Sequence, residues 1–263
     1  MGRQRLTVLV QTAMSCSLPP ELLDHIVDHL HDNPTALKAC CVVAKSWVPR
    51  ARSHLFARVE FGISKNPIGR WMKTFPDPLN SPAHHTRSLF ICGLAPATPQ
   101  DVDISPSWIR SFHNLADLHL DHCIWEDREA LIPFHGLSPN LRSLRLTSTS
   151  FGVFDLVCSF PLLEDLALIG IFPEGAFARN TQASSPKLTG SLSLSSSAGI
   201  SLAIGRLLDL PNGLHFTKVV LLYLGEEDTR SAVDLVSRCS GTLESLTCRY
   251  RGAHTFPSTS TIG

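Results

Sequence analysis

A short leucine phrase recurs along most of the chain and constrains its fold more than any other feature. The phrase reads L-x-x-L-x-L, and in the weaker copies Thr, Phe, Val, Ile or Cys replaces a leucine; the copy at 188–194 carries one extra residue. The middle residues of the seven copies lie at positions 89, 118, 144, 166, 192, 219 and 246, so successive copies are 29, 26, 22, 26, 27 and 27 residues apart. This spacing clusters around the roughly 20–29-residue period of leucine-rich repeats.

Apolar segments of helical length lie between the copies of the phrase. They cover residues 68–75, 107–112, 154–160, 202–210 and 231–239. One repeat cannot bury its apolar side alone, so stacked repeats place their leucines in one core and align their strands in parallel. An α/β sheet without solenoid curvature also alternates strands and helices. The even period favours a one-directional solenoid over about 84–250.

The repeat strands predict both a core row and an open face. We expect Leu118, Leu144, Leu166, Leu192 and Leu246 to share one core. Because side chains alternate along a strand, the intervening residues should line the open side of the sheet. These residues are Asp117, His119, Asp121, Ser143, Arg145, Thr147, Asp165, Ala167, Ser191, Ser193, Lys218, Val220, Ser245 and Thr247. The densest polar group, Asp117, His119, Asp121 and Arg145, is the candidate binding surface, although plain solvent exposure explains most of the other positions.

Ahead of the repeats, residues 18–56 predict three short helices. The first starts after Pro19 with apolar residues at helical spacing, and Asn33 is a plausible N-cap with Pro34 at the first helical position of the second. Trp47 lies at the start of the third. A segment of this size has too few residues for a large core, so we expect it to dock onto a partner or onto a larger core.

This segment resembles an F-box, whose pattern runs roughly Leu-Pro-x-Glu-Leu-Leu-x-x-Ile-x-x-x-Leu, then a Leu, a Cys/Val cluster and Ser-Trp. The chain supplies, in order, Leu18, Pro19, Glu21, Leu22, Leu23, Ile26, Leu30, Leu37, Cys40, Val43, Ser46 and Trp47. Later stretches, RWMKTFPDP, VCSFPLLEDLAL, SPKLTGSL and DLVSRCSGTLESL, are similar to the expanded fungal F-box family. The resemblance implies binding to the Skp-type adaptor of a Skp–cullin–F-box ubiquitin ligase. Leu18, Pro19, Leu22, Ile26 and Trp47 are the candidate adaptor-binding residues.

The sequence thus predicts an α/β chain with a three-helix F-box at 15–60, a leucine-rich-repeat-like array at 61–250 and a tail at 251–263. We expect the array to be truncated at its C-terminal end, because a polar capping repeat normally covers the last core layer. The predicted function is substrate recognition for the ligase, by proximity and without catalysis. A repeat scaffold outside any ligase, or an inactive truncated copy, is the alternative.

Composition argues against several other classes of protein. Lys plus Arg equals Asp plus Glu at 23 each, so no concentrated basic surface for nucleic acid or anionic membrane is expected. The apolar runs are too short to span a membrane. Eight cysteines without a C-x-x-C pair suit a reducing compartment, the cytoplasm or the nucleus.

Catalytic and metal motifs are weak. The chain has no G-x-S-x-G, P-loop or G-x-G-x-x-G motif, and we predict neither an enzyme nor a cofactor. His119, His122 and Cys123 lie close in sequence, but in an extended strand the two histidines point to opposite faces. We therefore predict no metal site.

Overall fold

The computed structural model describes residues 19–62, 67–93, 106–123, 132–148, 153–170, 186–196 and 200–252. The chain divides into two compact units, Met1–Leu55 and Phe56–Gly263, called here the N-terminal unit and the repeat unit.

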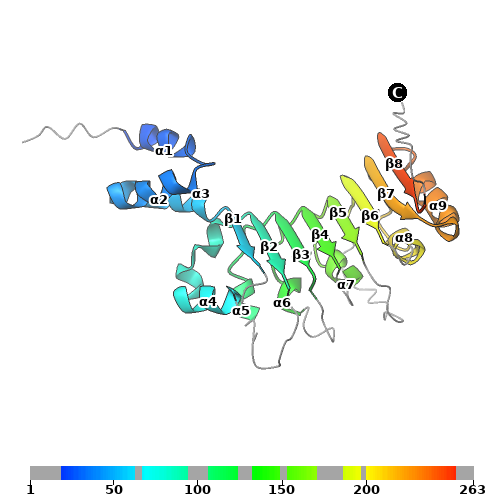
Figure 1. The fold of residues 1–263 in the computed structure, drawn as a ribbon, viewed down its shortest axis with the longest axis horizontal. Helices are drawn as coiled ribbons and strands as arrows, with labels where there is room; N and C mark the ends of the chain where they lie inside the picture. Colours follow the sequence, from blue (N-terminus) through cyan, green and yellow to red (C-terminus); the bar gives the residue numbers. More distant parts are fainter. Residues whose placement is uncertain are drawn as a thin grey trace, which may run out of the picture. The chain divides into compact units, whose positions relative to one another are not determined.

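The N-terminal unit contains three short α-helices (Figure 1): α1 (Pro20–Asp28), α2 (Pro34–Val43) and α3 (Val48–Leu55), the last preceded by the 3-10 turn η1 (Lys45–Trp47). The predicted N-cap is confirmed, because the Asn33 side chain accepts the backbone N–H of Ala36 at 3.0 Å and Pro34 begins α2. Among the residues that the structure describes in this unit, the buried core consists of Val27, Leu37, Cys40 and Ala51. A core of this size leaves much of the apolar surface of the helices uncovered.

The repeat unit is built on one eight-stranded sheet whose spatial order follows the chain. Its strands are β1 (Arg58–Phe61), β2 (Ser88–Cys92), β3 (Asp117–Asp121), β4 (Ser143–Thr147), β5 (Asp165–Ile169), β6 (Ser191–Ser195), β7 (Lys218–Leu224) and β8 (Ser245–Tyr250). Every neighbouring pair is parallel, as the ribbon in Figure 1 shows. The predicted α/β class and one-directional order of the strands are confirmed.

Helices connect most of the strands. They are α4 (Pro67–Thr74), α5 (Pro106–Ile109), α6 (Ile132–His135), α7 (Val153–Cys158), α8 (Ser201–Leu208) and α9 (Thr229–Cys239), with 3-10 turns η2 (Pro78–Asn80), η3 (Pro82–His85) and η5 (Glu226–Asp228). Five of the six helices overlap the predicted segments. The sixth, α6, was not predicted, because its sequence, Ile-Pro-Phe-His, shows no apolar repeat at helical spacing.

The strand register confirms the predicted core row. Leu89, Leu118, Leu144, Leu166, Leu192, Val219 and Leu246 are successive partners across seven strands. All belong to one hydrophobic cluster, in which the first six are at most 1% exposed and Leu246 is partly buried. The middle residue of each phrase is therefore the residue that stacks on its neighbours.

One strand lies ahead of the seven that the phrase predicts. In β1, Val59 and Phe61 point into the core and pair with Leu89 and Ile91 of β2. The sequence search missed this strand because it contains no leucine, and the predicted boundary between residues 60 and 61 falls inside it.

The extra residue of the 188–194 phrase is accommodated ahead of β6. Leu188 forms an isolated parallel bridge with Leu214, and the backbone N–H of Ser191 donates to Oδ1 of Asp165 at 2.6 Å. A side chain at Gly190 would meet this carboxylate, since its Cβ would lie 2.5 Å from Oδ1 of Asp165. Because glycine has no side chain to block it, the Asp165 carboxylate takes the place of a backbone carbonyl as the hydrogen-bond acceptor at the start of β6.

Candidate functional site

The first helix of the N-terminal unit exposes two large apolar side chains. Leu22 and Ile26 are 50% and 41% exposed. They lie four residues apart on α1, a spacing that places them on the same side of a helix. Because Val27 on the same helix is fully buried in the small core, this helix has one covered and one uncovered apolar side. Uncovered aliphatic side chains of this kind suit contact with another protein.

The second helix exposes a pair that sequence reasoning did not select as site residues. Val42 and Val43 are 87% and 69% exposed at the end of α2. Residues 40–43 are all apolar, and successive helical residues point about 100° apart, so four in a row cannot all face one core. That run of four was the available sequence signal.

The other predicted adaptor-binding residues have different surroundings. Pro19 is exposed just before α1. Trp47 is half-buried and packs against the small core, where it contributes to the packing of the three helices. Leu18 lies outside the described residues.

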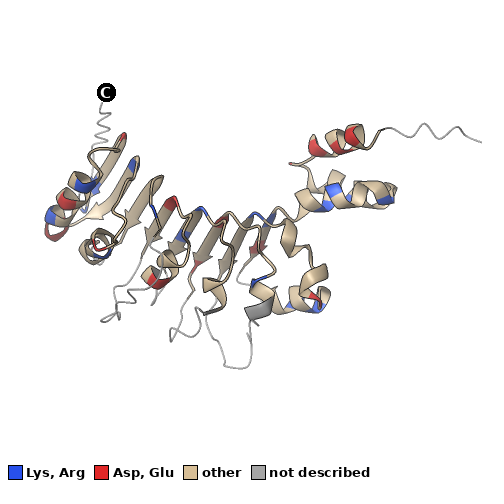
Figure 2. Cartoon of the chain, turned by 180° about the vertical axis from the view of Figure 1, so that it is seen from behind, with Lys and Arg blue, Asp and Glu red and all other residues tan. Residues whose placement is uncertain are grey.

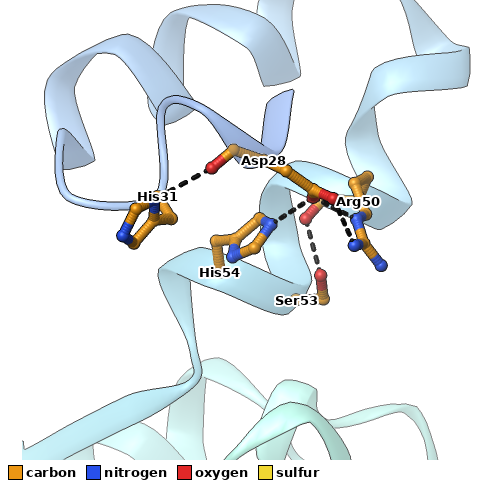
Figure 3. A network of polar contacts seen from close by, with 5 residues as sticks. All are labelled: Asp28, His31, Arg50, Ser53 and His54. Atoms are coloured by element: carbon orange, nitrogen blue, oxygen red, sulfur yellow. Dashed lines mark hydrogen bonds and ion pairs between the residues drawn. The ribbon is translucent and has the colours of Figure 1, made fainter. Parts of the chain in front are cut away.

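A polar network joins the end of α1 to α3 (Figure 3). The carboxylate of Asp28 accepts Nε of Arg50 at 2.5 Å and the terminal nitrogen Nη2 at 2.6 Å, and Nε2 of His54 lies 2.7 Å from Oδ1. The hydrogen bond from Arg50, followed by that from His54, holds the pKa of Asp28 well below its ordinary value. The network links two helices that share few buried side chains.

The predicted polar group on the repeat unit is brought together on two adjacent strands. His119 of β3 is the direct partner of Arg145 of β4, and Asp117 and Asp121 lie two residues either side of His119. Neighbouring strands are about 4.8 Å apart, so these four side chains share one patch of the open face. Figure 2, a view from behind, shows acidic and basic residues distributed together along the strands.

The pKa values of His119 and Asp117 in this patch are shifted in opposite directions. Burial, followed by the nearby Arg145 guanidinium, lowers the pKa of His119, while burial and the Asp165 carboxylate raise the pKa of Asp117. These surroundings favour the neutral form of the His119 ring, whose Nε2 lies 3.2 Å from the Thr147 hydroxyl. A neutral imidazole between carboxylates and a guanidinium can exchange hydrogen bonds with a polar segment of a partner.

An aromatic ring that sequence reasoning overlooked borders this patch. Phe90 of β2 pairs with His119, and their ring centroids are 4.7 Å apart in an edge-on arrangement. Phe90 sits at the outward position between Leu89 and Ile91, so strand alternation alone would have identified it. The patch thus combines polar groups with one flat apolar surface.

The three residues weighed together as metal ligands do not form a ligand group in the described part of the chain. His119 bonds to Thr147, and the buried thiol of Cys123 is directed at the carbonyl of Asp121, 3.4 Å away. His122 instead lies against the carboxylate of Asp121, with Nδ1 and Oδ1 2.8 Å apart.

None of the helices that the structure describes has the length and apolar character needed to cross a bilayer. No protein-family model matches the chain, and a comparison with curated proteins finds no match.

Proposed function

We propose that this chain is a substrate-recognition adaptor of a Skp–cullin–F-box ubiquitin ligase. In this proposal the N-terminal unit is an F-box that binds the Skp-type adaptor, and the repeat unit holds the protein substrate. The chain contributes binding energy and geometry, because placing a substrate near a charged ubiquitin-conjugating enzyme raises its effective concentration.

The observation that carries the proposal is the exposure of Leu22 and Ile26 on a helix that the F-box pattern predicts for adaptor contact. Complete burial of a Leu or Ile side chain stabilises a complex by about 1.5–3 kcal/mol. Leu22 and Ile26 are only 50% and 41% exposed within the chain, so the gain from each residue is smaller. Even about 1.4 kcal/mol corresponds to a tenfold change in Kd.

The substrate surface of the proposal is the patch of Asp117, His119, Asp121 and Arg145. Its support is the register of β3 and β4, which gathers both signs of charge beside the ring of Phe90. Such a patch suits a polar peptide segment better than a uniformly charged polymer. Fold alone does not identify the substrate.

The test is a calorimetric titration of the full chain with a purified Skp-type adaptor, which measures the Kd of the complex. Leu22→Asp and Ile26→Asp should each weaken binding at least tenfold, because each would place a carboxylate in an apolar contact. Val233→Asp is the matched control: Val233 is 58% exposed on α9 of the repeat unit, and its replacement should leave Kd unchanged.

Absence of binding by the native chain, or unchanged affinity in both α1 variants, would contradict the proposal. In that case a repeat scaffold that acts outside a ligase, or a copy without a working partner, becomes the better account. Circular dichroism of the variants should show native helix content, since both replaced side chains are substantially exposed.

A further inference from the structure

The carboxyl ends of β2 and β3 bring together three side chains that bind transition metals. Cys92 is the last residue of β2, its strand partner Asp121 is the last residue of β3, and His122 follows directly. One ligand atom from each side chain can be chosen so that all three lie within 4.8 Å of one another. Cys92 is 29 residues away from Asp121 in the chain, so this arrangement depends on the pairing of the strands.

One of the separations matches tetrahedral zinc geometry, and a second requires a local adjustment. The thiol of Cys92 lies 3.6 Å from Oδ2 of Asp121. Zn–S and Zn–O bonds of about 2.3 and 2.1 Å at a tetrahedral angle would separate sulfur and oxygen by about 3.6 Å. Nδ1 of His122 is 2.8 Å from Oδ1, the other oxygen of the same carboxylate. Binding through one shared oxygen requires the Asp121 carboxylate to turn and the imidazole to move, since a tetrahedral N–Zn–O pair spans about 3.4 Å.

The backbone holds His122 in the orientation that makes this possible. His122 has a φ of 50°, which takes it out of the extended conformation of β3. Its N–H donates to the carbonyl of Thr147 at 2.9 Å, and the carbonyl of Asp121 accepts the N–H of Gly93 at 2.9 Å. The expectation that His122 continues the strand alternation does not hold there, because the strand ends at Asp121.

Exposure gives a metal ion access to the group. The side chain of His122 is 66% exposed and that of Asp121 is 21% exposed. The half-buried Cys92 thiol donates to the Asp121 carboxylate. A bound dication would take the place of the thiol proton in this contact.

We propose that Cys92, Asp121 and His122 bind a divalent transition metal of the zinc class, through Sγ, one carboxylate oxygen and Nδ1. The mixture of thiolate, carboxylate and imidazole favours zinc or cobalt over magnesium or calcium, which select oxygen ligands. Water occupies the fourth position, and the thiol proton is released to solvent on binding. The metal ties the end of β2 to the turn after β3. This site is independent of the proposed ligase function.

Cobalt is the direct probe, because a Co²⁺–thiolate bond produces a charge-transfer absorption that carboxylate and imidazole ligands alone do not give. We expect the full chain, kept reduced, to show this absorption with one Co²⁺ per chain and to lose it when Zn²⁺ is added. Cys92→Ser should abolish the absorption. His122→Gln should weaken binding more than tenfold, since loss of even an outer-shell partner costs about 10- to 100-fold.

Two variants control for other metal ligands of the chain. Cys158→Ser replaces another half-buried cysteine and should leave the absorption unchanged. His29→Gln disrupts the His25–His29 pair of α1, whose Nε2 atoms are 3.2 Å apart, and should also leave it unchanged because that pair has no thiolate. No absorption in the native chain, or persistence of the absorption in Cys92→Ser, would overturn the proposal. His122→Gln alters an exposed side chain, so its result does not depend on a change in folding.

Discussion

The carboxylate of Asp228 caps the preceding helix through Ser201, 27 residues earlier. Its Oδ1 accepts both the backbone N–H of Ser201 at 2.9 Å and its hydroxyl at 2.7 Å. The same oxygen accepts the N–H of Ile200 at 2.9 Å, and Oδ2 accepts the N–H of Gly225 at 2.9 Å. Asp228 is fully buried. One carboxylate therefore joins the start of α8 to the turn before α9 and satisfies donors that helix formation leaves unpaired.

Removing this carboxylate should destabilise the repeat unit strongly. A hydrogen bond to a charged group is worth about 1.5–3 kcal/mol, and Asp228→Ala would leave several buried donors without a partner. Asp228→Asn should also destabilise, because its NH₂ group would face the N–H of either Gly225 or Ser201. Urea unfolding gives the free energy of each variant. Asp234→Asn, at an exposed position of α9, should leave that free energy within about 0.5 kcal/mol of the native value.

The hydrogen bonds of Asp228 should also make the unfolding free energy of the repeat unit depend on pH in the acidic range. Burial alone would raise the pKa of Asp228, but the N–H groups of Gly225, Ile200 and Ser201 and the Ser201 hydroxyl hold it below its ordinary value. A carboxyl group whose pKa is lower in the folded state stabilises the fold at pH values above its unfolded-state pKa of about 3.9. This stabilisation is lost as the pH falls through the folded-state pKa. Unfolding free energy should therefore fall less steeply below about pH 4 in Asp228→Asn than in the native chain. Equal slopes would show that the pKa of this carboxylate is the same in the folded and unfolded states.

In the N-terminal unit, Asp28→Asn should loosen the contact between α1 and α3. The neutral amide loses the ionic part of the bidentate contact with Arg50 and the pairing with His54. Hydrogen–deuterium exchange should become faster in peptides from both helices and stay unchanged in peptides from α8 and α9. Asp32→Asn is the control, since that side chain is 90% exposed, and should leave exchange in all these helices unchanged.

The burial of each leucine predicts how strongly its replacement by alanine destabilises the repeat unit. Leu144 is 1% exposed between Leu118 and Leu166, and Leu→Ala at such a site costs about 2–5 kcal/mol. Leu246 is only partly buried, so Leu246→Ala should cost less. Leu162→Ala, at a residue 49% exposed, should cost least. Thermal and urea unfolding should rank the three variants in this order; an equal cost for Leu246→Ala would mean that β8 is buried as deeply as β4.

That row was predictable from sequence because its period is set by stacking: each repeat must place an apolar residue over the previous one, whatever its loops do. The extra residue before Leu192 shifted the phrase but not the register, since Gly190 and Asp165 absorb it. β1 was hidden because Val59 and Phe61 fill the same positions without a leucine.

Side-chain groups from different strands were harder to predict. The approach of Cys92 to Asp121 depends on register across 29 residues, and the orientation of His122 depends on one positive φ. The polar group of Asp117, His119, Asp121 and Arg145 was recovered because strand alternation alone places it. Local periodicity thus predicts faces, while groups that form where strands end require the backbone itself.

The last prediction concerns an irregularity in β7. Tyr223 has a φ of 61°, and the pairing of β7 with β8 shifts register between Leu222 and Leu224. Tyr223 is thus an inserted residue, 49% exposed, and the insertion turns Leu224 into the core at 1% exposed.

For a residue other than glycine this left-handed conformation costs about 1–2 kcal/mol, and a β-branched side chain fits it worst. Tyr223→Val should therefore lower the unfolding free energy by about 1 kcal/mol or more. Tyr223→Gly should stay near the native value, since relief of strain offsets the added entropy of the unfolded chain. Thr247→Val, at a regular position of β8, should be neutral or slightly stabilising. Equal stability of the Val and Gly variants in urea unfolding would show that Tyr223 carries no backbone strain in solution.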